Sequence, residues 1–419
     1  MFQRNEIVGK FNVVHVSAML VAVLIPLNKK MVPIALILLF LSTLVYYKQT
    51  RKPFTFSLAL ISLALLYLLH VAGMLVTTDM AEGWFALELK MSMLFIPLYF
   101  LLFKPFTAQQ TKLILLAFIA GCFGYSVVGF VGSIKNYTGD GDTDWFFSGK
   151  ISYDIHPTYM AMYICTAILC ISAWLIQSWK KLHMGVKIGF LLLLPYFSVF
   201  VLLLASKGGI IGLAVTWMAI VMYFFYYIGR WYIGIGAVVL ALAGLVYLIK
   251  YPTVTRWKFE KATEIYYMPV DSVIALYSES TESNAVRRMV WHVSWECVKQ
   301  NPMGEGTGDS QNHLHAEFKK RGITGAYKHK LNCHNQYLET IMAVGIPGLL
   351  LFIIFLLAGI WNGIREKKFI LIWLIIIAMV NMLFESMFET QTGVVFLSFF
   401  ICMLIASPAA NEFSDDKMN

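Results

Sequence analysis

The sequence has 419 residues, of which 59% are hydrophobic and only 14% are charged, and its mean hydropathy is +0.69. This composition indicates an integral membrane protein and excludes an ordinary soluble domain. The formal net charge is +9, but no nucleic-acid-binding motif accompanies it, so nucleic acid is not an expected partner. The positive charge is explained better by membrane topology.

Apolar runs long enough to cross a bilayer, about 17 to 25 residues each, recur along the chain. Their length and their lack of strand-like alternation predict an all-α polytopic membrane protein with about twelve transmembrane helices. The predicted spans are residues 11–27, 31–47, 54–76, 85–103, 113–134, 157–178, 188–205, 208–228, 232–249, 336–361, 369–384 and 393–407. The expected organisation is therefore residues 1–250 with nine spans, residues 251–335 as an external helical loop, and residues 336–419 with three spans and a tail.

Lysine and arginine are concentrated in alternate loops, which predicts that both termini lie in the cytoplasm. The cytoplasmic set is Arg4, Lys10, Lys48, Arg51, Lys52, Lys104, Lys112, Lys180, Lys181, Lys187, Arg230, Arg365, Lys367 and Lys368. Lys29 and Lys30 are the exception, since they fall on the opposite side. No typical cleavage site follows the first apolar run, so we interpret it as a retained anchor.

The segment from Tyr251 to Cys333 is too long for a connector and too polar for the bilayer, so a small external lid is expected. Within it, residues 283–300 read as a capped helix that places Arg287 and Trp291 on one face. After Asn301-Pro302, the glycines at 304, 306 and 308 predict a flexible turn whose N–H groups could also cradle an anion. Cys297 and Cys333 fall outside the spans, so a disulfide between them stays open.

His334 and Asn335 stand where this external segment enters the next apolar helix. The unpaired N–H groups and partial positive charge of a helix N-terminus disfavour imidazolium, so the His334 ring is expected to stay neutral and able to accept a proton. Asn335 is a good N-cap residue. Further along, Gly345 and Pro347 predict that this helix is bent. A helix cap with a packing notch, and no chemistry, is the alternative interpretation.

On this topology the unusual polar residues gather at the external ends of the helices. They are His70, Glu88, Lys90, His156, Lys207, Glu385, Glu389 and Gln391. Because ionisable groups at membrane depth are costly and usually face a cavity, this pattern favours one external, partly embedded site. Ordinary interfacial anchoring is the alternative. A transporter should carry such groups near the midplane in two matching halves, which are not evident. His313 and His315 have no third metal ligand at suitable spacing, so no metal is expected.

His334-Asn335, nine residues, and then Gly345-Ile-Pro-Gly348 resemble the His-(Asn/Ser/Gln)-x9-Gly-x-x-(Gly/Thr/Tyr) signature of the O-antigen ligase family. Arg287, Trp291 and the Pro302-x-Gly304-x-Gly306 ending resemble that family's external-loop helix. The layout of spans extends the resemblance over nearly the whole chain. Lys90 and Lys207 also resemble family positions for phosphate-contacting cations. The turn at Lys207 usually carries arginine, however, and lysine offers a point charge instead of a bidentate fork.

The resemblance implies metal- and cofactor-independent transfer of a glycan from undecaprenyl diphosphate to an acceptor hydroxyl on the periplasmic face of the bacterial inner membrane. It implies His334 as general base and Arg287 as a catalytic cation. It further implies binding of the substrate or its diphosphate by Lys90, Lys207, Arg288, Trp291, Asn335 and His156. In-line attack predicts inversion at the anomeric carbon. Ligation to lipid A-core is preferred, while a repeat-unit polymerase, a protein O-oligosaccharyltransferase and a transporter remain as alternatives.

Overall fold

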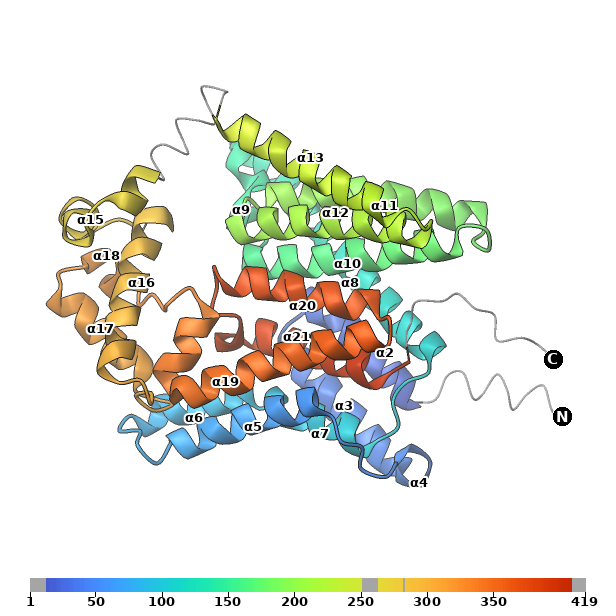
Figure 1. Cartoon of the computed structure of the whole chain (residues 1–419), viewed down its shortest axis with the longest axis horizontal. Helices are drawn as coiled ribbons and strands as arrows, with labels where there is room; N and C mark the ends of the chain where they lie inside the picture. Colours follow the sequence, from blue (N-terminus) through green and yellow to red (C-terminus); the bar gives the residue numbers. More distant parts are fainter. Residues whose placement is uncertain (1–12, 251–262, 282, 409–419) are drawn as a thin grey trace.

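The computed structural model describes residues 13–250, 263–281 and 283–408, and within these ranges it is built of helices and turns without a strand. The elements, shown in Figure 1, are α2 Val13–Leu27, α3 Val32–Val45, α4 Tyr47–Thr50, α5 Leu58–Gly73, α6 Met80–Lys90, α7 Ser92–Leu102, α8 Ala108–Asp140, η1 Thr143–Phe146, α9 Ser148–Ile151, α10 Pro157–Ser178, α11 Met184–Leu203, α12 Lys207–Tyr227, α13 Trp231–Lys250, α15 Val270–Tyr277, α16 Ser283–Gln300, α17 Ser310–Lys320, α18 Thr324–Lys328, α19 Gln336–Arg365, α20 Phe369–Met382, η2 Met387–Glu389 and α21 Gln391–Ala406.

Every apolar segment predicted from the sequence falls on a helix, so the prediction of an all-α polytopic membrane protein is confirmed. Six of the described helical segments are long and apolar enough to cross a membrane. They are Met80–Leu102, Ala108–Asp140, Pro157–Ser178, Met184–Leu203, Lys207–Tyr227 and Gln336–Arg365. Shorter apolar helices occupy the remaining predicted positions.

The fourth and fifth spans each begin five residues before their predicted starts, at Met80 instead of 85 and at Ala108 instead of 113, and local capping explains both. The fourth begins at Met80 because the Asp79 side chain accepts the N–H of Glu82, and it is divided into α6 and α7 at Met91. The fifth grows into the 33-residue α8, which a capping box of Thr107 and Gln110 begins. These polar signals lie outside the apolar runs that hydropathy detects.

Helix α10 lies at the centre of the bundle, beside α12 and α20 (Figure 1). Its side chains are buried on nearly every side, as expected for a helix that is apolar all round. At one end of the bundle, α15 to α18 form a separate group with a second apolar core, which includes Val290, Val293 and Phe318. The helix predicted at 283–300 is confirmed as α16.

Helix α19 is broken at Val344 and Gly345, where φ is −130° and +72° respectively, so the predicted bend is confirmed. The loop that follows α16 fills the break. Its Glu305 and Gly306 N–H groups donate to the carbonyls of Met342 (2.8 Å) and Ala343 (3.1 Å). Pro347 has no N–H to offer Ala343, so the loop supplies the bond that the helix lacks.

The predicted turn is present, and its glycines serve close packing. A Cβ on Gly304 would lie 2.6 Å from the backbone nitrogen of Gly345, and one on Gly308 would lie 2.3 Å from the Asp79 carbonyl oxygen. On the α6 side, the Asp309 carboxylate accepts the N–H groups of Thr78 (2.7 Å) and Asp79 (2.8 Å). The backbone is therefore bound on both sides, by α19 and by the α5–α6 connection.

Candidate active site

His334 and Glu385 form the centre of the candidate site. His334 immediately precedes the capped start of α19, and Glu385 lies in the turn after α20. The distance from His334 Nδ1 to Glu385 Oε2 is 3.2 Å. The backbone of His334 is in the left-handed region, with φ of +47°, and its N–H donates to Asn332 Oδ1 at 3.0 Å. Such a conformation is costly for a residue other than glycine, and functional sites often retain one.

Asn335 holds the start of α19 as predicted for an N-cap. Its Oδ1 accepts the N–H groups of Tyr337 at 3.0 Å and Leu338 at 3.2 Å. The cap satisfies two of the otherwise unpaired donors of the helix and fixes the backbone next to His334.

Arg287 reaches the same carboxylate from α16. Its Nη2 lies 3.6 Å from Glu385 Oε1 and donates to the Phe384 carbonyl at 3.5 Å. The guanidinium also lies over the Phe384 ring, with 5.9 Å from Cζ to the ring centroid. Arg287 Nε is buried without a hydrogen-bond partner in the described part of the chain, so one donor of the guanidinium is still available.

The charges of the site act on one another. Burial by itself would raise the pKa of Glu385, but the hydrogen bond with His334 and the charges of His156, His334 and Arg287 lower it below its ordinary value. Burial lowers the pKa of His156; Glu385 opposes this shift, and His334 and Arg287 add to it. Burial lowers the pKa of Arg287, and Glu385 opposes the shift. Glu385 is therefore an ionised acceptor at neutral pH.

Several helix N-termini meet around this cluster. His156 is the N-cap of α10 and its Nδ1 accepts the Thr158 N–H at 3.4 Å. The Thr158 hydroxyl lies 2.7 Å from that of Ser206, the N-cap of α12. Lys207 follows, and its Nζ donates to Asn284 Oδ1 in the first turn of α16 at 2.6 Å. The partial positive charges of such helix ends favour an anion.

Two other predicted binding residues lie on α16. The Arg288 guanidinium lies over the Tyr266 ring, with 5.4 Å to its centroid, and Trp291 is half-buried. Arg288 Nε and Trp291 Nε1 are buried without a partner among the residues described. Like Arg287 Nε, they are buried donors without a hydrogen-bond partner in this part of the structure.

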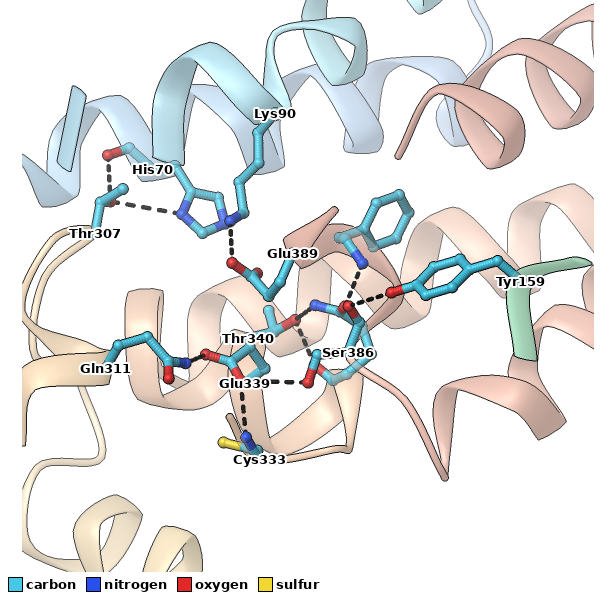
Figure 2. A network of polar contacts seen from close by, with 12 residues as sticks. His70, Lys90, Tyr159, Thr307, Gln311, Cys333, Glu339, Thr340, Ser386 and Glu389 are labelled. Carbon is cyan, nitrogen blue, oxygen red and sulfur yellow. Dashed lines mark hydrogen bonds and ion pairs between the residues drawn. The ribbon is translucent and has the colours of Figure 1, made fainter. Parts of the chain in front are cut away.

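Lys90 has a different environment from the one expected for a phosphate ligand. It is 3% exposed, and its Nζ forms an ion pair of 2.6 Å with Glu389 Oε2 (Figure 2). A phosphate that binds Lys90 would therefore compete with the Glu389 carboxylate for the ammonium group. The two cysteines left open by the sequence are both free thiols in the structure.

A cavity of about 1090 Å³ opens beside the cluster between α3, α6, α7 and the starts of α10 and α21. Phe40, Phe85 and Phe95 line its apolar part, and His156 and Glu389 line its polar part. At the polar side, Lys29 forms an ion pair of 3.0 Å with Asp154. Lys29 was an exception to the charge pattern of the loops, and this ion pair accounts for its position.

The sequence analysis placed Glu385 among the polar residues at the external ends of the helices without assigning it a role. Only the fold shows that Glu385 contacts both His334 and Arg287. The signal in the sequence was its position in a cluster of polar residues between two apolar spans.

Comparison with known proteins gives one family. Residues 188–353 match the family model described as O-antigen ligase. His334 and Arg287 fall inside the matched range, whereas His156 and Glu385 fall outside it. No curated protein matches the chain.

Proposed function

We propose that this chain, whose residues 188–353 match the O-antigen ligase family model, transfers a glycan from undecaprenyl diphosphate to a hydroxyl group of lipid A-core. The observation that carries the proposal is the cluster of His334, Glu385 and Arg287 beside a large apolar cavity. His156 belongs to both, since it lines the cavity and interacts electrostatically with the cluster. This combination suits an amphiphile with an anionic head and a hydrocarbon tail.

The His334–Glu385 pair supplies a base. When the neutral ring donates its Nδ1 proton to the Glu385 carboxylate, the lone pair of His334 is on Nε2, where it can take the proton of an acceptor hydroxyl. The hydroxyl oxygen then forms a bond to the anomeric carbon as the bond from that carbon to the diphosphate oxygen breaks. Attack opposite the leaving group inverts the anomeric carbon, and no glycosyl-enzyme intermediate forms.

The departing diphosphate needs fixed positive charge and hydrogen-bond donors. Arg287 Nε, Arg288 Nε and Trp291 Nε1 are buried donors without partners in the described chain, and the N-termini of α10, α12 and α19 lie around the same region. Lys207 adds a cation at the start of α12. We assign the diphosphate to this group of donors, and Lys90 to the support of Glu389.

The proposal places the cluster on the periplasmic side of the inner membrane, with both termini in the cytoplasm, because short loops retain positive charge on the cytoplasmic side. The described loops with the lysine and arginine excess lie at the opposite ends of the helices from His334. For example, the end of α19 that carries Arg365 is the far end from Asn335.

Labelling of introduced cysteines tests this orientation. A cysteine at Lys319 should react with a membrane-impermeant thiol reagent in intact spheroplasts, whereas one at Lys367 should react only after lysis. Both lysines are exposed, and all six native cysteines are buried, so the unmodified chain gives the background. Reversed reactivity of the pair would remove the site from the periplasm.

Transfer by purified protein tests the reaction itself. The protein is incubated with labelled undecaprenyl-diphosphate glycan and, separately, with lipid A-core, a second donor molecule or a pilin-like protein. A labelled lipid A-core product is expected. A lengthened lipid-linked glycan would identify a polymerase, and a glycosylated protein would identify an O-oligosaccharyltransferase. Absence of all three products, with glycan flux in liposomes, would contradict the enzyme proposal and support a transporter.

A further inference from the structure

Glu339 lies in the first turn of α19 and is 1% exposed. Figure 2 shows its carboxylate at the centre of a network of buried polar groups. Its Oε2 accepts the Cys333 N–H at 3.3 Å and the Ser386 hydroxyl at 3.3 Å. Its Oε1 accepts a hydrogen bond from Gln311 Nε2 on α17.

The two donors to Oε2 adjoin the two residues of the pair. Cys333 immediately precedes His334, and Ser386 immediately follows Glu385. One carboxylate oxygen therefore joins the chain segment that carries the imidazole to the segment that carries its partner. The bond through Gln311 extends this connection to the external helices.

The backbone at His334 makes such a support necessary. Its φ of +47° is unfavourable for histidine, and a strained residue persists only where its surroundings hold it. The Asn332 side chain restrains the N–H of His334 itself, and Glu339 restrains the N–H of the preceding residue. Without an acceptor at Glu339, the buried Cys333 N–H would have no partner there, and the segment would shift to satisfy it.

We propose that Glu339 is a positioning residue that sets the separation of His334 Nδ1 and Glu385 Oε2 by holding Cys333 and Ser386. This inference rests on the proposed function, because the separation matters for catalysis only if His334 is the base. Glu339 itself makes no contact with the reacting groups in this account. Lys90 and Glu389 pair with one another at 2.6 Å.

The test combines nitrogen NMR of histidine-labelled protein with transfer kinetics. The His334 ring resonance is assigned by its loss in His334→Gln. Glu339→Ala should change the Nδ1 resonance toward that of a ring without a carboxylate partner. The same variant should lower kcat by about 10²-fold, the usual cost of a misplacement near 1 Å, and leave the KM for the lipid-linked donor within about threefold of the wild type. Glu339→Gln keeps one acceptor oxygen, so it should restore most of both signals.

Glu317→Ala is the matched control, because Glu317 is also a buried carboxylate, and it bonds Lys320 and Arg321 on or next to α17, away from the pair. It should leave the His334 resonance and kcat unchanged.

If Glu339→Ala does not fold, Ser386→Ala removes one of the two bonds and should give a smaller change of the same kind. An unchanged His334 resonance in a folded Glu339→Ala or Ser386→Ala variant would overturn the positioning role. Wild-type protein that transfers to no acceptor would instead contradict the proposed function, while the NMR result still decides the role of Glu339.

Discussion

Replacement of His334 by alanine is expected to lower glycan transfer by about 10² to 10⁴-fold, the usual contribution of a general base, while binding of the lipid-linked donor persists. In the proposed site, donor binding depends on Arg287, the helix N-termini and the apolar cavity, none of which the substitution removes. The transfer rate of the wild type should also fall toward acid, because a general base can accept the hydroxyl proton only in its unprotonated form. The measurements are kcat and donor binding of both proteins between pH 5 and pH 8.

Protonation of Glu385 is not expected to cause this fall of the transfer rate toward acid pH. Its pKa is lowered below its ordinary value, so its ionised form, and the support it gives to His334, is lost only when the pH falls through that lowered value, below the range measured. His329→Ala is the control, since His329 is an exposed histidine of the same external segment. If His334→Ala transferred glycan at a near-native rate, and this rate still fell toward acid as in the wild type, His334 would not be the base. His156 would then be the next candidate.

Arg287→Ala is expected to reduce transfer by about 10²-fold or more, because a preorganised donor to the leaving diphosphate is lost. Arg287→Lys should recover only part of the activity, since an ammonium replaces a planar fork. Inorganic pyrophosphate should inhibit the wild type and inhibit Arg287→Ala much less. This inhibition separates loss of diphosphate binding from a disturbance of Glu385, which Arg287 also contacts.

Arg321→Ala provides the comparison for that experiment, because Arg321 is an arginine of the same external segment that is paired with Glu317 at 3.1 Å. It should retain both transfer and inhibition by pyrophosphate. Full activity of Arg287→Ala would reduce Arg287 to a residue that anchors α16 to the turn after α20.

Much of the fold follows from hydropathy, because a bilayer requires long apolar helices and each leaves a run of suitable length in the sequence. The bend of α19 was also predictable, since Pro347 removes a particular N–H from the ladder. The hydrogen-bond partner of the Ala343 carbonyl was not predictable. It comes from a loop some forty residues upstream, and only tertiary packing brings Gly306 to Ala343.

The candidate site divides in the same way. His334 was predictable from its local signature, whereas its partner Glu385 follows 51 positions later and meets it through the packing of α19 with α20. Lys90 was assigned to phosphate because the entry to its helix resembles a family position for a phosphate-contacting cation. Its counter-ion Glu389 is 299 positions away. No local sequence pattern predicts that these two residues form an ion pair.

The break in α19 also constrains how the protein is made. Pro347 prevents the helix from closing on the Ala343 carbonyl by itself, and in hydrocarbon such an unpaired group costs several kcal/mol. The ribosome delivers the loop at 302–306 before it delivers α19, so the acceptor's partner is already synthesised when the helix reaches the membrane. The hydrogen bonds of this helix are therefore complete only when the loop docks, because without the Gly306 N–H the Ala343 carbonyl loses its partner from the loop.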